Sequence, residues 1–180
     1  MASEEDRTEL LSKMEQERAR LLEVFAGLGE EGAEFAPDDA EGEAQWSAKQ
    51  QASHLTEMET AYRGWVEAAL AEDNPDVTER RGDKVAIPLE KAHEHEIADH
   101  VASLRDQRAR TIALIEQLSP EQLDRAATHK WFGTLSVLQW LRSYYRHDRM
   151  HVDQMSGRDP EYKPRFTTET EPDQRRSRLT

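Results

Sequence analysis

The feature that most constrains the fold of this chain is the spacing of its apolar residues, which recur every three or four positions along four long segments. This period places apolar side chains on one face of an α-helix, whereas a strand would show alternation. The segments run from Ser3 to Leu28, from Ser47 to Ala71, from Leu89 to Leu118 and from Thr134 to Met155. Helices with one apolar face bury it against each other, so the sequence predicts an all-α four-helix bundle.

Capping and turn residues mark where these helices begin and end. Ser47 and Gln50 have the spacing of a capping box at the start of the second helix, and Gly157 follows the fourth. Gly29 is expected to end the first helix, and residues 29–45 are predicted to form an acidic loop. A short helical turn is predicted over residues 120–126, where a serine precedes a proline.

The chain of 180 residues has the usual length of one domain. Residues 1–157 contain all four predicted helices and form the expected bundle. Residues 158–180 are rich in Pro, Thr, Glu and Arg and carry few apolar side chains. They are predicted to be an extended or disordered tail without which the bundle can fold.

The charge of the chain excludes some classes of partner. The net charge is −13, and no basic face is evident before the short run from Arg175 to Arg178. Binding to nucleic acid or to an anionic membrane needs concentrated Lys and Arg, so neither is expected. No run approaches the roughly 20 apolar residues that cross a bilayer, and the acidic N-terminus resembles no signal peptide. We therefore expect a cytoplasmic protein.

Three histidines continue the apolar faces of two predicted helices. His147 and His151 lie four residues apart, a spacing that brings side chains to about 5–6 Å at Cβ, close enough to bind one ion. His54 begins the apolar face of the second helix and is predicted to point inward. If the second and fourth helices are antiparallel, His54 lies near the pair. The sequence therefore predicts a divalent metal site formed by His54, His147 and His151.

Other titratable residues offer alternative sites that the pattern favours less. Asp148 makes residues 147–151 similar to the HExxH motif of zinc peptidases, but it should point sideways, toward a neighbouring helix or solvent, and is interpreted as a carboxylate on the helix surface. Glu90 and His93 have the ExxH spacing of di-iron bundles, but the inward positions of the second helix are expected to supply His54 in place of the bridging glutamate. His129 is expected to be a loop residue and not a ligand.

The order and spacing of these residues resemble the DinB/YfiT-like superfamily from the first helix to the end of the fourth. The resemblance rests on Trp46-Ser47 followed by His54-Leu55, and on Phe132-Gly133-Thr134 followed by His147 and His151. It implies a four-helix bundle, a divalent metal bound by the three histidines, and frequent dimerisation. The superfamily includes thiol-dependent transferases and mycothiol-dependent maleylpyruvate isomerases.

Three neutral imidazoles leave coordination positions open, as in catalytic metal sites, and zinc, nickel, iron and copper all suit them. The chain has no cysteine, so any sulfur nucleophile must come from a ligand. The leading hypothesis is a metal-dependent transferase or isomerase that activates a low-molecular-weight thiol for attack on an electrophile. Tyr144, one turn before His147, is the candidate catalytic side chain. A hydrolase that activates water and a non-catalytic metal-binding or stress-response protein are the alternatives.

Overall fold

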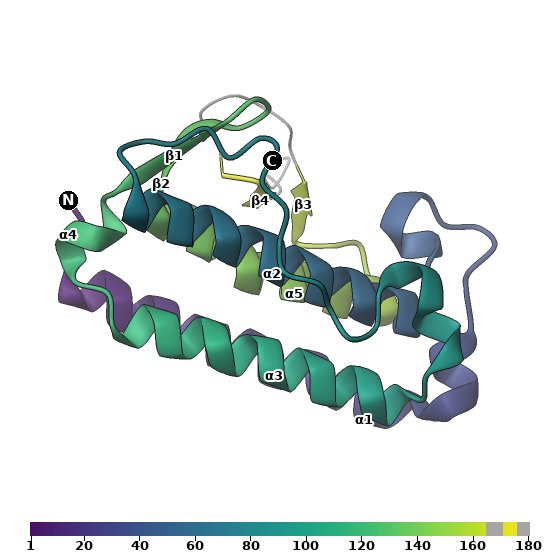
Figure 1. The fold of residues 1–180 in the computed structure, drawn as a ribbon. Helices are drawn as coiled ribbons and strands as arrows, with labels where there is room; N and C mark the ends of the chain where they lie inside the picture. The colour runs from purple at the N-terminus through teal and green to yellow at the C-terminus, as the bar shows by residue number, and fades with distance from the viewer. Residues whose placement is uncertain (165–170, 176–180) are drawn as a thin grey trace, which may run out of the picture.

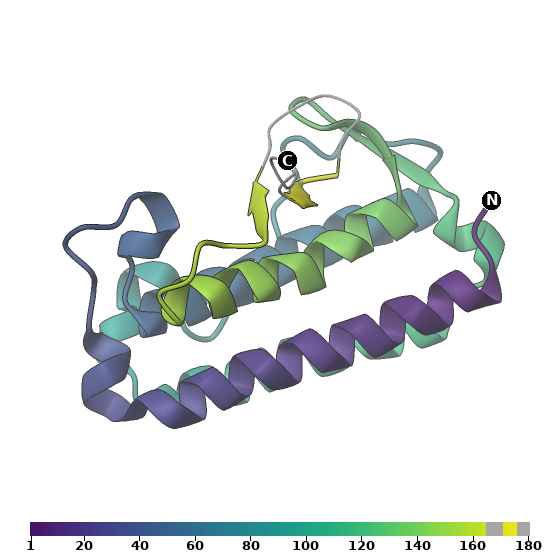
Figure 2. The ribbon, with the colours of Figure 1, turned by 180° about the vertical axis from the view of Figure 1, so that it is seen from behind.

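Four long helices dominate the computed structural model, which describes residues 1–164 and 171–175 (Figure 1). They are α1 (Glu4–Glu34), α2 (Ala48–Ala71), α3 (Ile97–Glu116) and α5 (Val137–Met155). α1 and α3 form one layer, and α2 and α5 form the other, as Figures 1 and 2 show from opposite sides. The all-α bundle predicted from the apolar spacing is therefore confirmed. Within the described residues, no helix is both long and apolar enough to cross a lipid bilayer.

Contacts between the helices define their directions. Arg18 of α1 donates to the Leu104 carbonyl at 2.6 Å, and Arg108 of α3 donates to the Met14 carbonyl at 2.8 Å, so α1 and α3 are antiparallel. α2 and α5 are also antiparallel, because the start of α2 contacts the end of α5. This is the arrangement that brings His54 toward the histidine pair on α5.

Serine capping boxes begin α1, α2, α5 and the short helix α4 (Pro120–Leu123). Each serine hydroxyl accepts the backbone N–H three residues later, which satisfies one of the unpaired donors of the first turn. The pairs are Ser3 with Asp6, Ser47 with Gln50, Ser119 with Gln122 and Ser136 with Gln139. The prediction for α2 is confirmed, whereas α5 begins three residues later than Thr134 because its cap is Ser136.

Two predicted helix boundaries are wrong. Gly29, with φ of +65°, kinks α1 without ending it, and the helix continues to Glu34, into the first part of the segment predicted to be a loop. That segment also contains a short 3-10 helix, η1 (Gly42–Gln45). The third predicted helix is interrupted: Leu89–Glu94 form a separate 3-10 helix, η2, and extended backbone at His95 and Glu96 precedes α3.

Two small hairpins lie on the α2 and α5 layer (Figures 1 and 2). β1 (Ala126–His129) pairs with β2 (Gly133–Ser136), with Ala126 opposite Ser136. β3 (Tyr162–Pro164) pairs with β4 (Asp173–Arg175) in the segment predicted to be a tail. The remainder of that prediction, for residues 165–170 and 176–180, lies outside the described residues.

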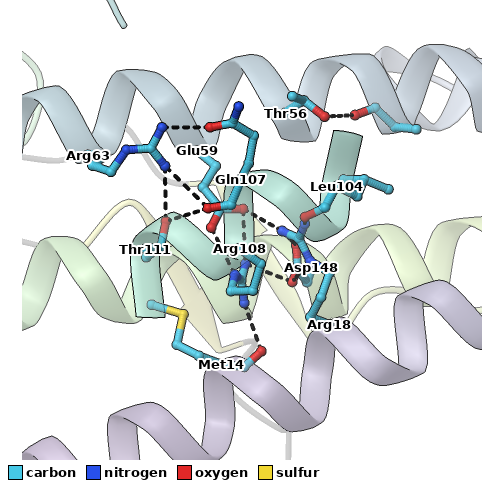
Figure 3. Close-up of polar contacts among 11 residues, drawn as sticks. Met14, Arg18, Thr56, Glu59, Arg63, Leu104, Gln107, Arg108, Thr111 and Asp148 are labelled. Atoms are coloured by element: carbon cyan, nitrogen blue, oxygen red, sulfur yellow. Dashed lines mark hydrogen bonds and ion pairs between the residues drawn. The ribbon is translucent and has the colours of Figure 1, made fainter. Parts of the chain in front are cut away.

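The apolar core consists of two clusters, and four charged side chains lie between them. Figure 3 shows the polar contacts of these four side chains. Arg18 donates to Glu59 at 2.6 Å and to Asp148 at 2.9 Å. Arg108 donates to the same two carboxylates at 2.8 and 2.9 Å. Two positive and two negative charges thus compensate one another among helices α1, α2, α3 and α5.

Asp148 points toward the neighbouring helices α1 and α3, which is one of the two directions expected for it, but its interpretation as a surface carboxylate is wrong. Its side chain is 1% exposed and accepts hydrogen bonds from both arginines. The prediction failed because it treated α5 as having one apolar face and took a polar residue beside that face to be solvated. In the structure α5 is covered by both α1 and α2, so a wider part of its surface is buried.

Candidate metal centre

His54, His147 and His151 converge where the start of α2 faces the second half of α5. The Nε2 atoms of His54 and His147 are 3.0 Å apart. The ring of His151 lies 5.5 Å from the ring of His54 and 4.9 Å from that of His147, measured between centroids. The structure thus brings together the three residues singled out from the sequence. That they bind a metal stays a prediction.

Glu43 in η1 adds a fourth donor group to these histidines. Its two carboxylate oxygens lie 3.3 Å from His54 Nε2 and 3.7 Å from His151 Nε2. One donor atom from each of the four residues lies within 4.8 Å of all the others. The sequence analysis missed Glu43, because nothing in its spacing distinguishes it from the other carboxylates of the acidic segment.

Neighbouring side chains orient two of the imidazole rings. His151 Nδ1 lies 2.9 Å from the Gln51 Oε1 atom, which can only accept, so Nδ1 carries the proton and Nε2 keeps its lone pair. His147 Nδ1 faces Asp173 Oδ2 at 3.5 Å. Nε2 of His151 is buried and has no hydrogen-bond partner among the described residues. A metal site requires a nitrogen lone pair that has no hydrogen-bond partner and points toward the other candidate ligand atoms. These residues therefore fit a divalent ion.

The electrostatics of the cluster also suit a cation. Burial lowers the pKa of the His151 imidazole well below its usual range, and its histidine neighbours lower it further, which favours the neutral ligand form. Burial would raise the pKa of Glu43, but its hydrogen bond to His54 and the nearby imidazoles outweigh this effect and lower it. Burial would lower the pKa of His147, but the Asp173 carboxylate raises it. Glu43 and Asp173 therefore supply negative charge on two sides of the histidines.

A cavity of about 410 Å³ opens beside the cluster. Glu43, His54 and His147 line one part of it, and the predominantly apolar remainder includes several aromatic rings. The aromatic lining residues are Tyr62, Trp65, Trp131 and Phe132. Three exposed cations, Arg80, Arg81 and Lys130, also line this cavity, which we call the aromatic pocket.

The other histidines lie apart from the centre. His129 belongs to β1 and not to a loop; it is buried, lines the aromatic pocket and packs on Trp65 at 4.9 Å between ring centroids. His100 is buried against the Ala92 carbonyl at 2.9 Å. Within residues 1–164 and 171–175, the centre at Glu43, His54, His147 and His151 is the only group of three or more His or carboxylate side chains close enough to share an ion. A di-metal site at Glu90 and His93 therefore has no support in this part of the chain.

Tyr144 is buried in the core, with its ring 5.4 Å from that of Tyr62. Its hydroxyl has no hydrogen-bond partner among the described residues, and Glu59 and Arg108 are among its charged neighbours. Tyr62 lines the aromatic pocket, whereas Tyr144 does not. The catalytic role expected for Tyr144 stays a prediction.

Comparison with known proteins gives one family and several similar structures, of which two are described here. The family model of the DinB superfamily matches residues 13–155. YfiT from Bacillus subtilis, described as a probable metal-dependent hydrolase with an unusual four-helix bundle topology, is similar with a TM-score of 0.70 and 18% identity over 87% of each chain. A mutant of a mycothiol-dependent maleylpyruvate isomerase gives a TM-score of 0.60 and 11% identity over 86% of this chain and 63% of the isomerase. These two likenesses show the fold. Comparison with curated protein sequences gives no significant match.

Proposed function

The chain belongs to the DinB superfamily, and we propose that it is a metal-dependent transferase or isomerase that uses a low-molecular-weight thiol, with His54, His147 and His151 as metal ligands. The observation that carries this proposal is that the histidine cluster opens onto the aromatic pocket. A structural metal is usually enclosed by four protein ligands, whereas three histidine ligands, with Glu43 beside the metal and not bound to it, leave a position for substrate. A divalent ion such as zinc, nickel or iron would supply a Lewis acid that lowers the pKa of a bound thiol.

The residues of this chain have distinct parts in the proposed reaction. Gln51 contacts Nδ1 of His151 on the side of the ring away from the cluster, so that Nε2 of His151 faces the centre. The Glu43 carboxylate, on the open side of the cluster, is placed to accept the proton that the thiol loses. Since the chain contains no cysteine, the sulfur must come from the bound cofactor.

The lining of the aromatic pocket favours a particular kind of electrophile. Tyr62 and Trp65 present ring faces and edges that bury an apolar or planar group. Arg81 is exposed at the same pocket and can pair with a carboxylate, a group that glutathione, bacillithiol and many electrophiles carry. We therefore expect the thiol and its electrophile to meet in this pocket with their charged ends toward solvent.

Hydrolysis is the second candidate, because Glu43 could accept a proton from water as well as from a thiol. The similar structure of YfiT is described as that of a probable metal-dependent hydrolase. A non-catalytic metal-binding protein, the remaining alternative, would not need the aromatic pocket. We also propose that the protein acts in the cytoplasm as a homodimer, for which light scattering of the purified protein and fractionation of cells are the tests.

The test begins with elemental analysis of protein purified without a histidine tag, followed by loading with Co²⁺. We expect one ion per chain, and a visible spectrum that changes on addition of glutathione, mycothiol or bacillithiol. Turnover of model electrophiles should require both the metal and the thiol. His54→Ala should abolish both properties, whereas His95→Ala, which removes a histidine outside the cluster, should retain them. An unchanged spectrum with all three thiols, together with ester cleavage, would favour the hydrolase.

A further inference from the structure

We infer that Asp173, in β4 of the C-terminal segment, is a positioning residue that orients His147 toward the metal. This inference rests on the metal site of the proposed function. It assigns a part in that site to a segment that the DinB superfamily match, which ends at residue 155, does not include.

The geometry around the His147 ring supports this assignment. Its Nε2 atom lies 3.0 Å from His54 Nε2, while its Nδ1 atom, on the other side of the ring, lies 3.5 Å from Asp173 Oδ2. Both Nδ1 and this carboxylate oxygen are buried, and neither has a better hydrogen-bond partner among the described residues. A carboxylate behind a metal-binding histidine fixes the tautomer in which Nδ1 donates and Nε2 binds the ion. Gln51 accepts a hydrogen bond from Nδ1 of His151 in the same way.

The C-terminal segment is docked so that Asp173 reaches this place. Arg146, the residue before His147, donates to the Asp173 carbonyl at 3.2 Å and pairs with Glu171. Arg142, one turn earlier on α5, lies 3.5 Å from the other oxygen of Glu171. Asp173 is also opposite Pro164 in the pairing of β3 with β4. The side chain of Asp173 is 1% exposed, although most of the described residues of this segment are partly or fully exposed.

The decisive measurement is the dissociation constant for Co²⁺, obtained from the visible absorption of the full-length protein in competition with a chelator. Removal of a group that orients a metal ligand typically weakens affinity about 10–100-fold. We expect a loss in this range for Asp173→Ala. Asp173→Asn should lose less, because its carboxamide oxygen can still accept the Nδ1 proton. The matched control is Glu161→Gln, which changes a carboxylate of the same segment that pairs with Arg175 at 2.8 Å and not with a histidine.

Unfolding of the metal-free proteins separates positioning from stability. Asp173→Asn and the wild-type protein should have similar midpoints without metal, while their Co²⁺ affinities differ. Equal affinities of Asp173→Ala and wild type would overturn this inference and leave the proposed function intact, as would an equal loss in Glu161→Gln. No Co²⁺ binding by the wild-type protein would overturn the proposed function together with the inference.

Discussion

Replacing Glu59 by glutamine should lower the free energy of unfolding by about 3–5 kcal/mol. The carboxylate of Glu59 is 3% exposed and accepts hydrogen bonds from Arg18 and Arg108 (Figure 3). Glutamine keeps the size of the side chain but removes its negative charge. Two buried guanidinium groups then face the single carboxylate of Asp148, and an uncompensated buried charge is what makes such a substitution costly.

The pKa of Glu59 gives a second estimate of this loss in the free energy of unfolding. Burial would raise this pKa, but the charges of Arg108 and Arg18 and their hydrogen bonds outweigh it and lower the pKa from 4.5 to about 2. Since one pKa unit corresponds to about 1.36 kcal/mol, the lowering is equivalent to about 3 kcal/mol of stability at neutral pH. The folded pKa is below the unfolded one, so this stability is present above about pH 4.5 and is lost as the pH falls toward 2.

Urea unfolding followed by circular dichroism at a series of pH values between 2 and 7 measures both effects, with EDTA present so that bound metal does not contribute. The difference between wild type and Glu59→Gln should be largest at pH 7 and shrink below pH 4.5. The control is Asp106→Asn, whose exposed carboxylate pairs with Arg110 at 3.0 Å, because exposed pairs contribute at most about 1 kcal/mol. A loss below about 1 kcal/mol in Glu59→Gln at pH 7 would refute this account of the charged layer.

Three further predictions concern the metal centre. His54→Ala should lose stoichiometric metal, measured by elemental analysis, and a full complement of metal would remove His54 from the site. Tyr144→Phe should lower turnover without loss of metal if the Tyr144 hydroxyl contacts the molecule bound to the metal. A loss of turnover in Tyr62→Phe alone would contradict this role and would instead fit the position of Tyr62 in the aromatic pocket. Acid should release the metal before it unfolds the helices, because protons compete for imidazoles below about pH 6.5, whereas Glu59 is protonated only at lower pH. Simultaneous loss of metal and helicity at every pH would contradict that order.

Local sequence patterns were sufficient to predict the helices and the histidine cluster. Helical periodicity and capping depend on residues three or four positions apart, so they predicted α2 closely and placed His147 and His151 on one face. The inward position of His54 followed from the same periodicity. Its approach to the pair required only that the two helices be antiparallel, a common arrangement in bundles.

The charged layer between the helices also left a trace in the sequence, although it was not recognised. Arg18 lies at helical spacing between the buried Met14 and Leu21, and Glu59 lies likewise between Leu55 and Tyr62. A charge at an apolar position indicates a buried partner, but it does not identify that partner. The pairing of these residues depends on which helices become neighbours.

Only the tertiary structure decided which groups complete the centre. Glu43 reaches it from a 3-10 helix, and Asp173 reaches it from a segment that follows the bundle. Neither residue lies in a segment whose apolar residues recur at a regular spacing. The strands of the two hairpins have only three or four residues, which is too short for a clear alternation of apolar and polar side chains. The sequence by itself determined most of each helix and the inward faces that carry the three histidines, because those depend on contacts between neighbouring helix turns. The approach of His54 to the pair and the positions of Glu43 and Asp173 depend on contacts between different elements and on the path of the connecting segments, and these are set only when the chain packs.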